Sequence, residues 1–114
     1  MANILMVNDR TYIRDFISKE LAHEEYRVVS VGDSKAIWKH IKNSQADLVL
    51  LDLYLDNSWQ VLHDIKTKDP NLPVLIYVIK SFEDIERIKK SIAEVINQKK
   101  NFQINNDLSV YYSY

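Results

Sequence analysis

Two acidic residues stand just after apolar segments, where they could build a reactive site. Asp9 is the second residue after the apolar run 4–7, and Asp52 directly follows the run 48–51. Two carboxylates a few ångströms apart raise each other's pKa unless a cation lies between them. Mg²⁺ suits such oxygen ligands and keeps waters that a phosphate can replace. Lys99, which follows a short apolar segment at 95–96, could balance the charge of an incoming anion.

A plainer interpretation of the two carboxylates stays open at this point. An aspartate at the end of a strand is often solvated or caps the next helix, and this alternative is strong for Asp9 alone. Asp52 follows four core aliphatic residues, where a lone carboxylate would be costly. The pair together therefore favours a site.

The elements that must position these residues alternate along the chain. Segments 4–7, 27–31, 48–51 and 74–79 are expected to be strands, with a short fifth at 95–96, and apolar residues at helical spacing lie between them. This alternation predicts an α/β fold, a parallel sheet covered on both faces by right-handed crossovers. In the flavodoxin-like order 2-1-3-4-5, the first and third strands are neighbours, so Asp9 and Asp52 should converge.

The C-terminal segment departs from this pattern. Residues 101–114 show no helical stripe, and 108–112 would suit a strand or a loose tail. We therefore expect a domain at 1–100 with an atypical extension at 101–114, and a fifth helix that is missing or replaced by the tail.

Composition excludes several classes of protein. The 114 residues suit one domain, are 46% hydrophobic, and include no cysteine, which excludes disulfides and thiolate metal sites. The single glycine excludes a Rossmann fingerprint and a P-loop, which need several. A net charge of −1 argues against binding to nucleic acid or to a membrane, and the apolar runs are too short to cross a bilayer. We expect a cytoplasmic protein.

Over residues 3 to 99 the chain resembles response-regulator receiver domains of two-component systems. The resemblance rests on segments 4–10, 46–53, 59–66 and 72–76. It implies that a histidine kinase or phosphotransfer protein phosphorylates Asp52. It also implies that Asp9, Asp52 and the carbonyl of Tyr54 hold Mg²⁺ as the cofactor, and that Lys99 contacts the phosphoryl group.

Several positions depart from the family's pattern. Asn8 replaces an acidic residue, so it can orient only a metal-bound water, and we expect weaker Mg²⁺ affinity. Compared with the family's pattern, the loop after Asp52 is about two residues short. Residues 56–58 stand where the family has a proline and then a glycine. Val78 stands at the family's switch hydroxyl and Ile96 at its aromatic switch position, so both switch positions are degenerate.

Three functions follow, in descending order. The first is a stand-alone phosphoacceptor domain, not an enzyme, that acts through protein contacts. The second is a pseudo-receiver that binds a partner without phosphorylation. The third is a metal-dependent aspartyl phosphatase, disfavoured because Tyr54 stands where a second carboxylate is needed. If the tail forms no helix, either its apolar residues or a second copy of the chain should cover the sheet, which predicts a tail-covered monomer or a homodimer.

Overall fold

A five-stranded parallel sheet organises the part of the chain that the computed structural model describes, residues 1–42, 46–101 and 110–113. Its strand order is β2-β1-β3-β4-β5, which confirms the predicted flavodoxin-like arrangement. The strands are β1 (Asn3–Val7), β2 (Arg27–Val31), β3 (Leu48–Asp52), β4 (Val74–Tyr77) and β5 (Val110–Ser113). The inner strands β3 and β4 are buried along their whole length, as expected for apolar runs covered on both faces.

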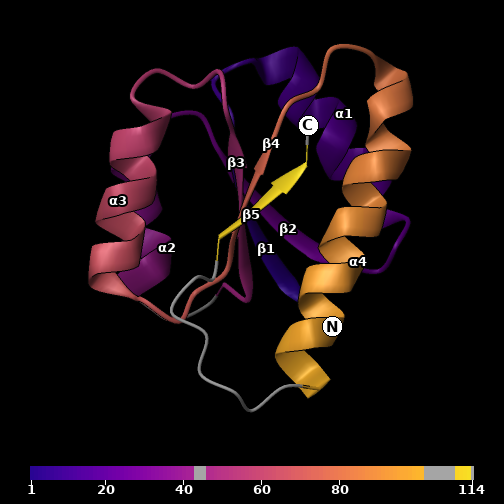
Figure 1. Cartoon of the computed structure of the whole chain (residues 1–114). Coiled ribbons are helices and arrows are strands. Elements are labelled where there is room, and N and C mark those ends of the chain that lie inside the picture. The colour runs from indigo at the N-terminus through magenta and orange to yellow at the C-terminus, as the bar shows by residue number, and fades with distance from the viewer. Residues whose placement is uncertain (43–45, 102–109, 114) are drawn as a thin grey trace.

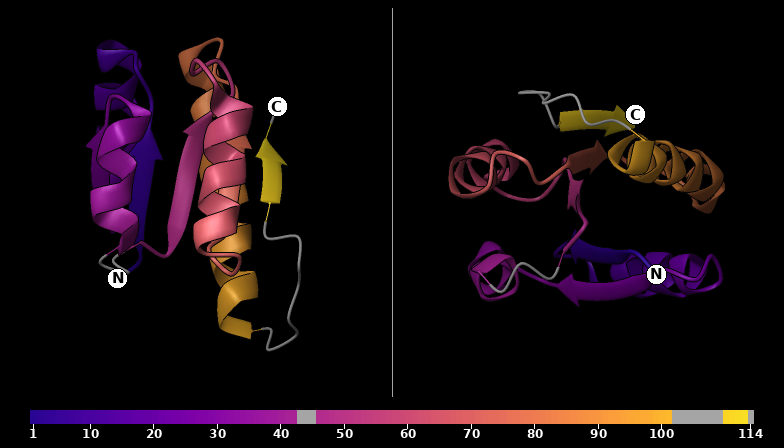
Figure 2. Two further views of the ribbon diagram at one scale, coloured as in Figure 1. Left: turned by 90° about the vertical axis from the view of Figure 1, so that its left-hand side faces the viewer. Right: turned by 90° about the horizontal axis from the view of Figure 1, so that it is seen from below.

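Helices cover both faces of the sheet (Figures 1 and 2). They are α1 (Thr11–Ala22), α2 (Ile37–Lys42), α3 (Ser58–Lys68) and α4 (Ile85–Asn101), with short 3₁₀ turns η1 (Ser34–Ala36) and η2 (Phe82–Asp84). One apolar core lies under α1 and α4, and a second lies under α2 and α3. No helix of the described residues is long and apolar enough to span a membrane.

Side-chain caps start two of these elements. The Asp33 carboxylate accepts hydrogen bonds from the backbone N–H groups of Lys35 and Ala36, at 2.9 and 3.1 Å. Ser81 and Asp84 form a capping box at η2. These contacts fix the loops that leave the sheet at its carboxyl edge.

Helix α3 starts from a residue with an uncommon backbone conformation. Ser58 is the first helical residue, and the cap is Asn57, whose φ of 62° lies in the left-handed region. Asparagine tolerates this conformation better than most residues, because its short polar side chain can bond locally. The loop after Asp52 therefore turns without a glycine.

The predicted fifth strand at 95–96 is wrong. Val95 and Ile96 belong to α4 and extend its buried stripe of Ile85, Ile88 and Ile92. Two apolar residues cannot distinguish a strand from one more turn of a helix, because the periodicity needs a longer window. The tail supplies the fifth strand instead, since β5 pairs in parallel with β4.

The last crossover is not right-handed, contrary to the sequence prediction. Helix α4 lies on the same face as α1, and the ammonium of Lys89 in α4 contacts the carboxylates of Glu20 and Glu24, at 3.0 and 3.6 Å. The connections β1–α1–β2 and β4–α4–β5 run in opposite directions across the sheet, so on one face they have opposite hands. The first is right-handed and the last is left-handed, an arrangement found in roughly 2% of such units.

A side-chain network joins β5 to α4. The Arg87 guanidinium donates to the Ser113 hydroxyl at 2.6 Å and to the Val78 carbonyl at 2.8 Å. The Ser91 hydroxyl contacts the same Ser113 oxygen at 3.1 Å. Because Ser113 is the last residue of β5 and is buried, this network anchors the strand that completes the sheet.

The variant Arg87→Ala should lower the free energy of unfolding by about 1–2 kcal/mol, because the Val78 carbonyl and the Ser113 hydroxyl lose a charged donor. Urea denaturation followed by circular dichroism measures the change. Lys90→Ala, at an exposed position of α4, is the control and should stay within about 0.5 kcal/mol of the wild type. Equal stability of the two variants would show that the network does not hold β5.

Candidate functional site

The register of the sheet brings Asn8 and Asp52 to one edge. Strands β1 and β3 are parallel neighbours, and Val7 lies beside Leu51. The residues that follow these two, Asn8 and Asp52, therefore end their strands together at the carboxyl edge. Asp9 comes next in the turn toward α1 and is exposed. The predicted neighbourhood of the first and third strands is confirmed.

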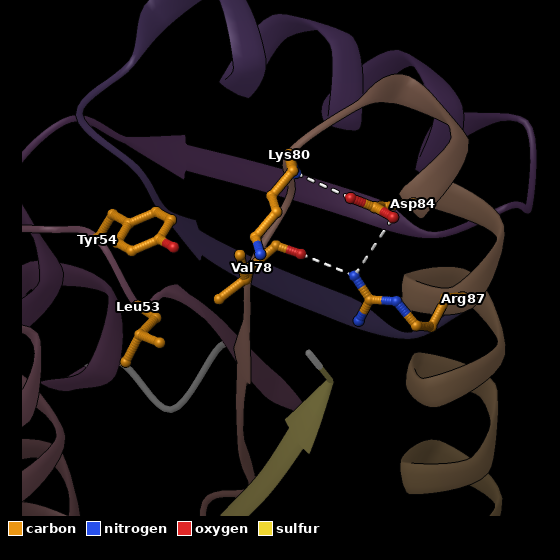
Figure 3. Close-up of a pocket in the computed structure, with 6 residues that line it drawn as sticks. All are labelled: Leu53, Tyr54, Val78, Lys80, Asp84 and Arg87. Atoms are coloured by element: carbon orange, nitrogen blue, oxygen red, sulfur yellow. Dashed lines mark hydrogen bonds and ion pairs between the residues drawn. The ribbon is translucent and has the colours of Figure 1, made fainter.

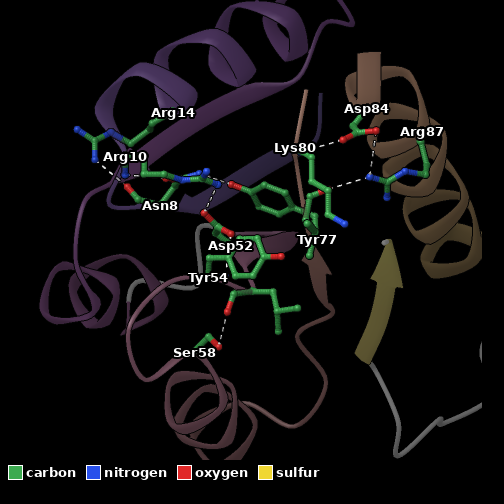
Figure 4. Close-up of polar contacts among 12 residues, drawn as sticks. Asn8, Arg10, Arg14, Asp52, Tyr54, Ser58, Tyr77, Lys80, Asp84 and Arg87 are labelled. Atoms are coloured by element: carbon green, nitrogen blue, oxygen red, sulfur yellow. Dashed lines mark hydrogen bonds and ion pairs between the residues drawn. The ribbon is translucent and has the colours of Figure 1, made fainter. Parts of the chain in front are cut away.

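Asp52 is fully buried, and its two oxygens accept hydrogen bonds from different groups (Figure 4). Oδ1 accepts from the backbone N–H of Tyr54 at 3.0 Å, and Oδ2 accepts from Nη2 of Arg10 at 2.8 Å. A buried carboxylate is costly unless a charge partner and hydrogen bonds compensate it. Arg10 is that charge partner, and the sequence analysis missed it although it directly follows Asp9.

The Arg10 side chain spans the distance between solvent and Asp52. It is 40% exposed overall. Its Nε, however, is buried and has no hydrogen-bond partner among the atoms of the described residues. The guanidinium therefore holds one donor on Asp52 and keeps a second one unsatisfied inside the site.

A buried hydrogen bond between Asn8 and Tyr77 supports the loop that carries Arg10. Asn8 Nδ2 donates to the Tyr77 hydroxyl at 2.6 Å, and Asn8 Oδ1 accepts from the backbone N–H of Arg10 at 2.7 Å. Burial, and then the nearby Asp52 charge, raise the pKa of Tyr77 well above its ordinary value. Because both polar groups of its side chain already contact protein groups, Asn8 orients Arg10 in this structure. The metal-bound water predicted for it stays a prediction.

The single glycine of the chain leaves room for a second arginine. Nη1 of Arg14 donates to the Asn8 carbonyl at 2.8 Å. A Cβ atom added at Gly32 would lie 2.7 Å from that same nitrogen, closer than real contacts allow. A side chain at this position would therefore push Arg14 off the Asn8 backbone.

The predicted positions of Lys99 and Ile96 are wrong. Both belong to α4, which starts near the carboxyl edge of the sheet and runs back toward the other edge. At about 1.5 Å per residue, Lys99 lies roughly 21 Å along the axis from Ile85. Lys99 therefore does not follow a fifth strand, and Ile96 packs in the core under α4. Val78 directly follows β4, is buried and has no hydroxyl, and its assignment to the switch position stays a prediction.

The residues at this edge do not fit Mg²⁺ as they are arranged. The described residues contain no cluster of three acidic, histidine or cysteine side chains that could hold a metal ion. Asp52 Oδ2 is paired with Arg10, and the Asn8 amide is engaged. Of the other predicted ligands, Asp9 and the Tyr54 carbonyl remain. A divalent ion would have to displace the guanidinium, which already supplies the positive charge.

A shallow hollow of about 320 Å³ lies beside this edge (Figure 3). It is lined by Leu53, Tyr54, Val78, Lys80, Asp84 and Arg87. Lys80 reaches past Val78 in this view, whereas Arg87 is engaged by Val78 and Asp84. The hollow thus places a lysine beside the aliphatic residue at the end of β4.

Comparison with known proteins identifies a family. A family model for the response regulator receiver domain matches residues 4–105. The response regulator ArlR of Staphylococcus epidermidis is 36% identical over 83 residues, which cover 71% of this chain and 37% of that protein. The DNA-binding transcriptional regulator NtrC of a Bradyrhizobium species is 32% identical over 76 residues, 65% of this chain and 16% of that protein. The chain thus spans well under half of these relatives.

Solved structures show the same fold. A response regulator receiver domain protein (CheY-like) from Methanospirillum hungatei has a TM-score of 0.77 at 19% identity, covering 88% of this chain and 97% of that one. The response regulator protein TrrA from Thermotoga maritima, in complex with Mg²⁺ and BeF, has a TM-score of 0.73 at 22% identity, covering 82% and 98%.

The variant Tyr77→Phe should change how stability depends on pH. An unfolded tyrosine ionises near pH 10, whereas the folded pKa of Tyr77 is raised, so its contribution is fully present below pH 10 and is lost as the pH rises. Above pH 10, the wild type should lose about 1.4 kcal/mol per pH unit more than this variant does. Urea denaturation at pH 8, 10 and 11 measures the difference.

The control for this experiment is Tyr12→Phe, because Tyr12 is 67% exposed and its loss should leave the pH dependence of the wild type unchanged. Parallel pH profiles for the wild type and Tyr77→Phe would contradict the assignment of a buried, neutral phenol beside Asn8.

Proposed function

Because the chain belongs to the response regulator receiver domain family, we propose that it is a signalling domain whose phosphoacceptor is Asp52. The donor would be the phosphohistidine of a histidine kinase or of a phosphotransfer protein. The observation that carries the proposal is the geometry of Asp52, a buried carboxylate at the carboxyl end of β3 with an N–H on one oxygen and a guanidinium on the other.

These contacts suit an in-line transfer. A lone pair of an Asp52 oxygen forms the new P–O bond, the P–N bond of the phosphohistidine breaks, and its electron pair returns to the imidazole nitrogen. The N–H of Tyr54 fixes the direction of the carboxylate, so the nucleophile is oriented before the donor arrives. Arg10 covers Asp52 and is partly exposed, so its side chain has to shift for the donor to enter.

Mg²⁺ enters this proposal as a competitor of Arg10. The related TrrA has been solved with Mg²⁺ and BeF, and the sequence predicts weaker Mg²⁺ binding here because Asn8 replaces an acid. The ion pair between Arg10 and Asp52 lowers affinity further, since the ion and the guanidinium seek the same oxygen.

The variant Arg10→Ala should bind Mg²⁺ about five- to tenfold more tightly than the wild type, because the competing cation is removed. Isothermal titration calorimetry at fixed ionic strength measures the affinity. Asp52→Asn is the control and should bind Mg²⁺ more weakly than either. An affinity of Arg10→Ala no higher than that of the wild type would show that Arg10 does not compete for the site.

A second candidate is a pseudo-receiver that binds a partner without phosphorylation. Val78 favours it, because an aliphatic side chain at the family's switch hydroxyl cannot bond to a phosphoryl oxygen. The third hypothesis, an aspartyl phosphatase, gains no support, because Tyr54 offers no second carboxylate.

The remaining parts of the proposal follow the sequence analysis. Output is through contacts with a downstream protein in the cytoplasm. Homodimer formation stays a prediction. The apolar residues of β5 already join the two cores of this chain, since Val110 packs against one and Tyr111 against the other, which favours the tail-covered monomer.

Incubation with phosphoramidate should add the mass of one phosphoryl group to the intact protein, and neutral hydroxylamine should remove it, as expected for an acyl phosphate. Mass spectrometry of the whole chain measures both steps. Asp52→Asn should gain nothing, whereas Asp56→Asn, an exposed aspartate four residues on, should be labelled like the wild type. A wild type that stays unlabelled at saturating donor would favour the pseudo-receiver.

A further inference from the structure

The transfer proposed for Asp52 needs a cation beside the phosphoryl group, and Lys99 belongs to α4 instead of following a fifth strand at the carboxyl edge. We propose that Arg10 binds the phosphoryl oxygens once the group is on Asp52. This inference rests on the proposed function and assigns the role that the sequence analysis gave to Lys99. One contact of the Arg10 guanidinium, its unsatisfied Nε and one hydrogen bond of its backbone carry it.

The first observation is the direct contact. Nη2 of Arg10 lies 2.8 Å from Oδ2 of Asp52. A phosphoryl group attached to that carboxylate brings its oxygens immediately next to the guanidinium. Charge developing on those oxygens is therefore met by a neighbouring cation, and a cation placed in this way stabilises phosphoryl transfer.

The second observation is the donor that remains unsatisfied. Nε of Arg10 is buried and has no hydrogen-bond partner in the described part of the chain. Nε and Nη2 lie on the same edge of a guanidinium, and that edge binds two oxygens of a phosphate or carboxylate in parallel. In this structure Asp52 engages one half of the edge, and a phosphoryl oxygen would satisfy the other half.

The third observation is the way the loop holds Arg10. Asn8 Oδ1 accepts a hydrogen bond from the backbone N–H of Arg10 at 2.7 Å, and Asn8 Nδ2 donates to the Tyr77 hydroxyl at 2.6 Å. Both Asn8 and Tyr77 are buried, so the backbone of Arg10 is positioned by the core. Asn8 and Tyr77 are therefore positioning residues for the guanidinium.

The other cations described at this edge are engaged elsewhere or make no contact with Asp52. Arg14 donates to the Asn8 carbonyl, and Arg87 donates to Ser113 and Val78. Lys80 lines the neighbouring hollow and is the competing candidate. The experiment must therefore distinguish Arg10 from Lys80 as the cation that contacts the phosphoryl group.

The test compares the rates at which phosphoramidate labels the wild type, Arg10→Gln, Arg10→Lys and Lys80→Gln, by intact mass. In this reaction an Asp52 oxygen forms the P–O bond, the P–N bond breaks, and the nitrogen leaves as ammonia after taking a proton from water. Arg10→Gln should lower the maximal rate by at least about tenfold, since single donors to such charge are worth 10²–10³ in enzymes. The maximal rate of Arg10→Lys should fall between those of Arg10→Gln and the wild type, and that of Lys80→Gln should stay within about twofold of the wild-type rate.

The outcomes separate the two proposals. If Arg10 only covers Asp52, Arg10→Gln opens the site and is labelled faster, which overturns this inference and leaves the phosphoacceptor intact. A large loss in Lys80→Gln, with Arg10→Gln unchanged, overturns it as well. An unlabelled wild type overturns the proposed function and this inference with it. Thermal melting shows which variants are folded, and Arg10→Lys keeps the charge should Arg10→Gln unfold.

Discussion

The ion pair between Arg10 and the buried Asp52 is the interaction on which the site depends. A carboxylate with no exposed surface cannot stay charged unless a cation and hydrogen bonds compensate its lost hydration. The structure meets this need with a residue of its own chain, adjacent to the acidic loop. Asp52 thus lies buried at the carboxyl end of β3, and the charge beside it comes from the side chain of Arg10.

The rest of the carboxyl edge can be understood as support for that pair. The Asn8 side chain holds the backbone of Arg10 and is itself hydrogen-bonded to the Tyr77 hydroxyl. Arg14 donates to the Asn8 carbonyl, and its guanidinium occupies space that a side chain at position 32 would fill. An acidic residue in place of Asn8 could not donate to Tyr77. Asn8 therefore builds a hydrogen-bonded loop under the guanidinium.

The connection from β4 through α4 to β5 is also unusual. Helix α4 lies on the same face of the sheet as α1, and the tail supplies β5. The crossover from β4 through α4 to β5 therefore has the uncommon left hand. Its long apolar stripe and the ion pairs of Lys89 attach α4 to α1, and Arg87 attaches it to β5. The same rearrangement carries Lys99 away from the edge where Asp52 lies.

The sequence by itself determined the sheet order, the first four strands and the place of Asp52 at the end of β3, because buried parallel strands such as 48–51 are unbroken aliphatic runs. Only the tertiary structure decided the fifth strand, the face of α4 and the partner of Asp52. A short run such as 95–96 has no period of its own, and the contact between residues 10 and 52 depends on how β1 and β3 lie side by side.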